Sequence, residues 1–192
     1  GVMKRAHAMP FGAQVEGDET RFRLWAPGAL GVELELERGG QPTRVPLTAD
    51  DAGWYETRVR DAGAGTLYRY RIDGDLCVPD PASRHNPHGV HHASEVIDPA
   101  AFDWQDAAWR GRPWEDAAIY ELHVGALTPP GNFDRVRSRL DYLAELGVTA
   151  IELMPLAEFP GRRGWGYDGV LPFAPKAAYG RPEALKTLVQ EA

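Results

Sequence analysis

The stretch that decides the fold runs from Val148 to Gly169 and reads VTAIELMPLAEFPGRRGWGYDG. It opens with an apolar run rich in branched residues, 148–154, which predicts a buried strand. Pro155 ends this strand, because proline offers no N–H to a neighbouring strand. The long loop that follows is rich in glycine and arginine and carries Trp165 and Tyr167. Loops of this length and composition are usually functional or disordered.

The pattern of residues 117–192 predicts a strand, a helix, a second strand, a loop and a second helix, in that order. Residues 117–124 predict a mostly buried strand, and the next helix begins at Asn132, a good N-cap, and ends at Gly147. A last helix opens at Pro182. Two such βα units require parallel strands, whose apolar edges further units must cover. We therefore expect a fragment of a longer protein, or a partner that supplies the rest. In such folds, function lies at the carboxyl ends of the strands.

Residues 10–97 carry the pattern of an antiparallel β-sandwich. Short alternating runs separated by turn residues recur at 20–26, 32–37, 54–59, 67–72 and 76–78. The last two runs predict a hairpin, because Asp73-Gly74 fits a tight type I′ turn. We expect no helix longer than one turn in this region. The spacing is typical of an immunoglobulin-like sandwich.

The segment 98–116 is predicted to connect the two parts. It contains Trp104, Trp109 and Trp114, whereas a flexible linker would be rich in glycine and serine. Three large aromatic residues favour a strap that packs down and holds the two domains together. The predicted chain is therefore multidomain, β plus α/β, with the divisions 1–97, 98–116 and 117–192.

Composition excludes several functions. The formal charge of −7 argues against a nucleic-acid partner. No apolar run approaches the roughly 20 residues of a membrane helix, and the first residues lack the apolar core of a secretory signal. The single cysteine, Cys77, cannot form an intramolecular disulfide and suits a cytoplasmic location.

Particular strings resemble a known superfamily. AIYELHVG at 118–125, LGVTAIELMP at 146–155 and WGYDG at 165–169 resemble the opening of an α-amylase superfamily (β/α)8 barrel. FRLWAP at 22–27 and PDPASR at 79–84 resemble the isoamylase-type N-terminal carbohydrate-binding module. With three further strings, the chain is most similar to the malto-oligosyltrehalose trehalohydrolase family. Those strings lie at 111–114, 159–163 and 178–182.

The resemblance implies the first two βα units of a TIM barrel and a retaining glycoside hydrolase. Such an enzyme would cleave the α-1,4 bond joining a maltooligosyl chain to a terminal trehalose, with two carboxylates about 5–5.5 Å apart. In the family, the catalytic carboxylates lie on later strands, so we expect no catalytic residue before Ala192 and an inactive fragment. The implied partners are an α-glucan, maltooligosyl trehalose, and the remainder of the barrel. No cofactor is expected.

The resemblance assigns substrate contact to Tyr167, because a flat ring presents an apolar face to the C–H face of a pyranose. Asp168 beside it can bond sugar hydroxyls, and Trp165 can form part of the pocket wall. Each residue has an ordinary alternative. The two aromatics can be packed into the protein, and an aspartate flanked by glycine is often a turn former.

Other polar residues receive structural interpretations. His123 is predicted to support the site or to lie in the core. Glu121 and Glu152 lie within strands, where a buried carboxylate would pair with a basic neighbour. A histidine cluster lies in the turn-rich segment without the spacing of a metal site, so no metal is predicted. Its members are His85, His88, His91 and His92.

The β-domain aromatics leave two interpretations open, a glycan platform or core packing. They are Trp25, Trp54 and Tyr68. Three rival functions also stay open: a glycogen branching or debranching enzyme, a non-catalytic α-glucan-binding module, and a nucleotide-binding domain. The last has little support, because the loop 125–131 is no G-x-G-x-x-G and its prolines remove amides that a phosphate would use.

Overall fold

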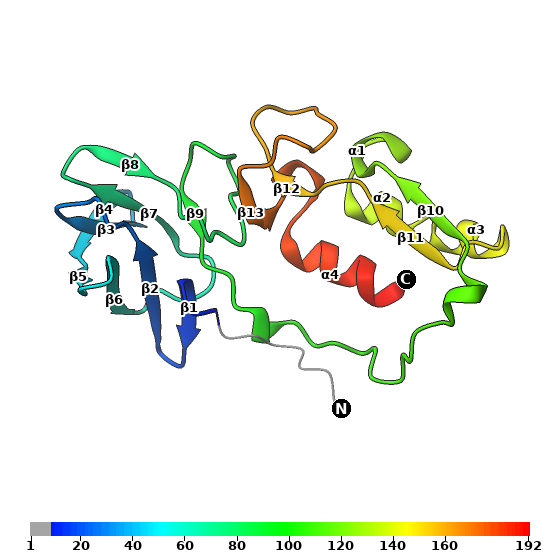
Figure 1. Cartoon of the computed structure of the whole chain (residues 1–192), viewed down its shortest axis with the longest axis horizontal. Helices are drawn as coiled ribbons and strands as arrows, with labels where there is room; N and C mark the ends of the chain where they lie inside the picture. Colours follow the sequence, from blue (N-terminus) through cyan, green and yellow to red (C-terminus); the bar gives the residue numbers. More distant parts are fainter. Residues whose placement is uncertain (1–8) are drawn as a thin grey trace.

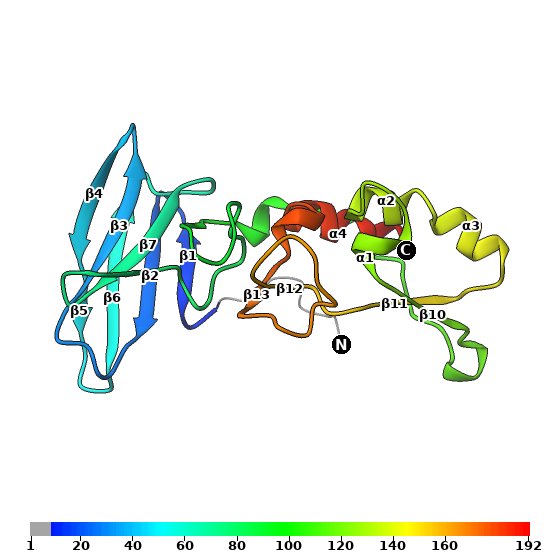
Figure 2. The ribbon, with the colours of Figure 1, turned by 90° about the horizontal axis from the view of Figure 1, so that it is seen from above.

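The structure is a computed structural model that describes residues 9–192. It is elongated, with the strands β1–β9 grouped at one end and the helices with β10 and β11 at the other (Figures 1 and 2). Among the residues described, no helix is both long and apolar enough to cross a membrane.

The N-terminal domain consists of two antiparallel sheets with a shared core. One sheet has the order β1-β2-β6-β5, and the other has the order β4-β3-β7-β8, with β9 also paired to β7. Alternate residues of both sheets meet in the core, among them Phe22, Leu34 and Tyr70, each fully buried. The strands are β1 Gly12–Glu16, β2 Glu19–Trp25, β3 Val32–Arg38, β4 Gln41–Pro46, β5 Thr48–Ala49, β6 Trp54–Arg60, β7 Leu67–Ile72, β8 Leu76–Val78 and β9 Ser94–Glu95.

The alternating runs of the sequence correspond to β2, β3, β6, β7 and β8. The alternating pattern did not predict β4, because Pro42 and Pro46 interrupt the alternation. This strand lies at the edge of its sheet, where proline is tolerated. The predicted hairpin between β7 and β8 is confirmed, and Asp73 and Gly74 both have the positive φ that a type I′ turn requires. Ile72 pairs with Leu76, so the loop has three residues, one more than a tight turn of this type has.

A buried carboxyl group ties the end of the sandwich to β7. Asp80 is 1% exposed, and its Oδ2 accepts a hydrogen bond of 2.6 Å from the Tyr68 hydroxyl. Its Oδ1 accepts from the Ala82 N–H at 2.9 Å. Burial disfavours the carboxylate and raises the pKa of Asp80 to about 6, although these two hydrogen bonds lower it in part.

Replacing Asp80 by asparagine should flatten the pH dependence of stability. The carboxyl pKa rises from 3.8 to about 6 on folding, so the folded state binds more protons between these values. The protonated carboxyl group therefore contributes fully to the free energy of unfolding below about pH 4. This contribution, about 3 kcal/mol, is lost as the pH rises through 6. Urea unfolding from pH 4 to 7 should show a smaller fall for Asp80→Asn than for the unmodified chain. The exposed Asp51→Asn is the control, and parallel profiles would contradict the assignment.

The connector runs along one side of the second lobe, below α4 (Figure 1). It starts with a 3-10 helix, Pro99–Ala101, and holds a second at Trp114–Asp116. Trp104 is half-buried against Phe102, with ring centroids 4.8 Å apart, but Trp109 and Trp114 are 65% and 78% exposed. The expectation of a packed strap is therefore wrong for the second half of this segment.

The second lobe is built on two parallel strands, β10 Ile119–Leu122 and β11 Ala150–Leu153, paired in register. Between them lie α1 Val124–Leu127, α2 Phe133–Arg137 and α3 Leu140–Glu145. The prediction of one helix from Asn132 to Gly147 is wrong. The Ser138 hydroxyl donates to the carbonyl of Arg135 at 2.8 Å, and a new helix begins only at Leu140. Side-chain bonds of this kind compete with the helical backbone.

The long loop after β11 contains structure that the sequence pattern did not reveal. An antiparallel pair, β12 Ala157–Glu158 and β13 Leu171–Pro175, encloses the segment 159–170. A 3-10 helix, Ala177–Tyr179, precedes α4 Pro182–Glu191. Glu121 and Glu152 are exposed neighbours on β10 and β11, so the expectation that they are buried and paired is wrong.

Contacts between the two lobes, among the residues described, include an ion pair, a pair of aromatic rings and a small apolar cluster. Arg181, next to α4, donates two hydrogen bonds to the mostly buried carboxylate of Glu95 in β9. Phe11 packs edge-on against Phe173, with ring centroids 5.8 Å apart. Val90 forms a small buried cluster with residues of β13, Leu171 and Ala174.

Candidate functional site

The three predicted substrate-contacting residues share one exposed segment between β12 and β13. Trp165 is 75% and Tyr167 72% exposed, and Asp168 is exposed beside them. Neither aromatic ring is packed into the core of this structure, so the alternative interpretation, that these residues pack inside the protein, is wrong here. Substrate contact itself stays a prediction.

His123 ties this segment to the carboxyl end of β10. It is the residue directly after that strand, and its Nε2 lies 2.8 Å from the carbonyl oxygen of Gly164. Because a carbonyl oxygen only accepts, Nε2 carries the hydrogen. The hydroxyl of buried Tyr179 lies 3.5 Å from the same nitrogen. Burial, and then the charge of Glu158, raise the pKa of Tyr179. Half-buried His123 thus supports the loop.

A buried ion pair holds the base of the same segment. Glu158 is fully buried and Lys176 is 4% exposed, with Nζ 2.8 Å from Oε1. The ammonium group also donates to the carbonyls of Phe159 and Gly161, at 2.8 and 2.7 Å. Lys176 thereby uses all three of its donors. The other carboxylate oxygen of Glu158 accepts from the Ala177 N–H at 2.6 Å. Sequence reasoning missed this pair, because only the β12–β13 hairpin brings the two residues together.

Glycines let the segment pass close to the chain that follows β11. Gly166 has φ +96°, and a Cβ atom there would lie 2.3 Å from the carbonyl oxygen of Pro155. At Gly169, a Cβ atom would lie 2.7 Å from the Cβ of Ala157. The backbone on both sides of Tyr167 is therefore fixed at positions that only glycine can occupy without a shift.

Gly166→Ala should destabilise the fold far more than Gly161→Ala. Both glycines have positive φ, which costs alanine about 1 kcal/mol, but only Gly166 faces a backbone atom too close for a Cβ. We expect an additional loss of about 1–3 kcal/mol from overpacking at Gly166. Urea unfolding of the two variants measures the difference. Equal losses would show that the contact with Pro155 is not maintained.

The aromatic residues of the β-domain and the clustered histidines, also considered as site residues, differ in how deeply they are buried. Tyr68 is 1% exposed and belongs to the sandwich core, Trp54 is half-buried, and Trp25 is 59% exposed. Of the histidines, His85 is buried, and burial lowers its pKa. Within residues 9–192, no group of three or more His, Cys, Asp or Glu side chains is arranged to hold a metal ion.

Comparison with known proteins connects both lobes to carbohydrate enzymes. Residues 10–101 match the family Carbohydrate-binding module 48 (Isoamylase N-terminal domain). The chain is 44% identical over 184 residues to malto-oligosyltrehalose trehalohydrolase of Saccharolobus solfataricus, covering 96% of this chain and 32% of that protein. It is 46% identical over 176 residues to the Deinococcus radiodurans enzyme of the same name, covering 92% and 28%. The chain thus spans about a third of the length of these relatives.

Solved structures agree over the whole chain. A Salmonella typhimurium protein described as an alpha amylase superposes with a TM-score of 0.91 at 43% identity, covering 97% of this chain and 31% of that one. Pullulanase from Paenibacillus barengoltzii gives a TM-score of 0.79 at 27% identity, covering 97% and 36%. Residues 10–101 therefore form a carbohydrate-binding module 48 domain, and the chain as a whole matches the N-terminal part of the malto-oligosyltrehalose trehalohydrolases.

Proposed function

We propose that the chain is the N-terminal part of a retaining glycoside hydrolase of the α-amylase superfamily. The substrate is maltooligosyl trehalose, and the enzyme cleaves the α-1,4-glucosidic bond next to the trehalose end and releases trehalose. The observation that carries the proposal is the exposed Trp165–Asp168 segment beside the carboxyl end of β10, in a chain 44% identical to such an enzyme. The single cysteine favours a cytoplasmic location.

The proposed architecture is a (β/α)8 barrel that continues beyond Ala192. The strands β10 and β11 are its first two, and among residues 9–192 they pair only with each other. Ile119 and Tyr120 on β10 are 50% and 38% exposed, which supports further strands as their cover. In this proposal the N-terminal domain at 1–97, of which 1–8 lie outside the described residues, and the connector at 98–116 precede the barrel. The paired carboxylates of a retaining hydrolase belong to its later strands.

The residues of this chain bind and orient the sugar. The Tyr167 ring stacks on the pyranose in the subsite where cleavage occurs, and Asp168 accepts hydrogen bonds from its hydroxyls. Trp165 forms part of the wall. Because His123 and Lys176 bind the carbonyls of Gly164 and Gly161, just before Trp165, the backbone that carries the ring is held in place before substrate arrives, which reduces the entropy lost on binding.

Incubation of the longer protein with maltotriosyl trehalose tests the proposal. Trehalose and maltotriose are expected, and proton NMR should show the α configuration retained in the first-formed maltotriose. New α-1,6 branches on amylose, without trehalose release, would replace the proposal with a branching enzyme. A branching enzyme of Burkholderia thailandensis is 36% identical over 189 residues, covering 89% of this chain and 23% of that protein. Glucan binding without any product would indicate a non-catalytic module.

A further inference from the structure

Two arginines stand directly before the exposed aromatic residues of the segment between β12 and β13. Arg162 and Arg163 are exposed, and neither side chain forms a hydrogen bond or an ion pair with another residue in the range 9–192. Trp165 and Tyr167 follow two and four positions after Arg163. A guanidinium group has five N–H donors and no acceptor. Both groups are therefore free to bind oxygen atoms of a ligand.

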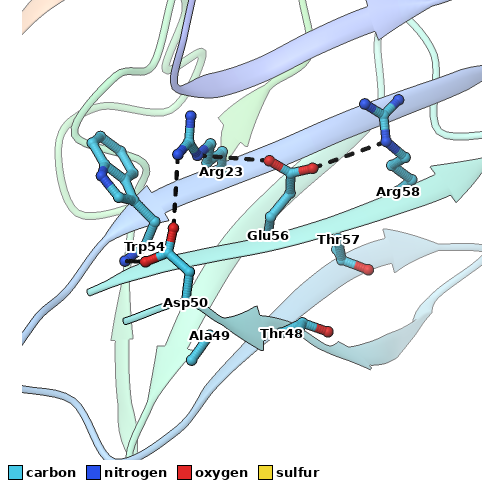
Figure 3. Close-up of a pocket in the computed structure, with 8 residues that line it drawn as sticks. All are labelled: Arg23, Thr48, Ala49, Asp50, Trp54, Glu56, Thr57 and Arg58. Carbon is cyan, nitrogen blue, oxygen red and sulfur yellow. Dashed lines mark hydrogen bonds and ion pairs between the residues drawn. The ribbon is translucent and has the colours of Figure 1, made fainter. Parts of the chain in front are cut away.

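Arginines on the β-sandwich have a different environment. On the outer face of the sheet β1-β2-β6-β5, the Arg23 guanidinium lies 3.9 Å from Asp50 Oδ2 and 3.6 Å from Glu56 Oε2 (Figure 3). Arg58 lies 3.9 Å from the other carboxylate oxygen of Glu56. There each cation has an anion of the protein beside it, so the group is accounted for by the fold. The described residues provide no such anion for the two arginines before Trp165.

The backbone on both sides of these two arginines is held in place. The Lys176 ammonium group donates to the carbonyl of Gly161 at 2.7 Å, and His123 Nε2 lies 2.8 Å from the carbonyl oxygen of Gly164. Gly164 also packs against the buried ring of Phe159, where a Cβ atom would lie 3.0 Å from ring carbon Cε2. Because the backbone is already fixed, less entropy is lost when the two side chains bind a ligand.

The aromatic rings of this segment are poorly suited to distinguish one glucose disaccharide from another. Trp165 and Tyr167 offer apolar faces, and every glucose ring presents similar C–H faces to them. Polar groups of fixed geometry discriminate more strongly, because an analogue that lacks the matching hydroxyl leaves them unpaired. A planar guanidinium group can donate two parallel hydrogen bonds to adjacent oxygen atoms. In the segment 159–170, only Arg162 and Arg163 carry such a group.

We propose that Arg162 and Arg163 bind hydroxyls of the trehalose end of the substrate and so determine specificity for that end. The choice of trehalose rests on the substrate proposed above. In this arrangement Tyr167 stacks on the glucose ring before the cleaved bond, and the arginines contact the rings beyond it. Four residues of extended chain span at most about 14 Å, so Arg163 lies close enough to Tyr167 to reach a neighbouring ring.

Calorimetric titration of the longer protein with trehalose and, separately, with maltotriose tests the proposal. These sugars are the two products of the proposed cleavage of maltotriosyl trehalose, so each reports on one side of the bond. The double variant Arg162→Gln, Arg163→Gln should raise the Kd for trehalose about 10- to 100-fold, because hydrogen bonds from charged groups are lost. The Kd for maltotriose should not change.

A matched control removes the same two charges elsewhere. Arg112 and Arg139 are exposed, and their side chains form no hydrogen bond or ion pair within the described part of the chain. Arg112 precedes the amino end of β10, and Arg139 directly precedes α3, which lies toward the far end of the second lobe from β12 and β13 (Figures 1 and 2). The double variant Arg112→Gln, Arg139→Gln should leave both dissociation constants unchanged.

The outcomes separate this specificity role from the proposed function. Weaker trehalose binding with unchanged maltotriose binding supports the role, whichever products the longer protein forms. Equal trehalose binding by the Arg162→Gln, Arg163→Gln variant overturns it, even where the product assay shows trehalose release. A lower unfolding temperature at equal trehalose affinity would assign the arginines to ion pairs within the longer protein. Weaker maltotriose binding alone, or no trehalose binding by the unmodified protein, would overturn the assignment to trehalose.

Discussion

Tyr167→Ala in the longer enzyme should lower kcat/KM for maltotriosyl trehalose by about 10- to 100-fold. The ring is 72% exposed here, and burying such a side chain against a sugar contributes about 1.5–3 kcal/mol. Tyr167→Phe should retain most activity, because the stacking face remains. Neither change should alter the free energy of unfolding by more than about 0.5 kcal/mol, since the side chain makes no core contact.

Tyr142 offers a matched control, because it is another exposed tyrosine, at 59%, on α3. Tyr142→Ala should leave kcat/KM unchanged. Steady-state kinetics on trehalose release, with thermal unfolding of each variant, distinguishes the two positions. Equal activity of Tyr167→Ala and the unmodified enzyme would remove Tyr167 from the substrate site. Equal losses in the two alanine variants would indicate a general effect on the fold.

Lys176→Met should destabilise the second lobe by about 3–5 kcal/mol, because it leaves the Glu158 carboxylate buried without its cation. The substitution also removes the donors of the Phe159 and Gly161 carbonyls at the base of the Trp165–Asp168 segment. We therefore expect that segment to become mobile before the lobe unfolds. Urea unfolding measures the loss, and hydrogen exchange of the Gly164–Val170 amides measures the mobility.

Arg137→Met is the control for Lys176→Met. Arg137 pairs with Asp134 and Glu191, all in exposed surroundings, so its loss should cost less than about 1 kcal/mol. Adding Glu158→Gln to Lys176→Met should restore part of the stability, because a neutral amide is less costly to bury than an unpaired carboxylate. A loss below 1 kcal/mol for Lys176→Met would show that water reaches the pair.

The sequence by itself determined the local features of both lobes. Alternation with period two placed β2, β3, β6 and β7, and Asn132 marked the start of α2, where its side chain accepts from the Arg135 N–H. These features depend on residues close together in the chain, so composition and spacing reveal them. The exposed glycine-rich segment with Tyr167 was found in the same way.

Only the tertiary structure decided what holds that segment. His123 and Gly164 are 41 residues apart, and Lys176 and Glu158 are 18 apart, so no periodicity connects them. The burial of the connector tryptophans also differed from the expectation, because composition gives a side chain's preference for burial but not its neighbours. Strand patterns are local and repeat along the chain. An ion pair or a hydrogen bond between loops exists only where the fold brings its two partners within about 3 Å.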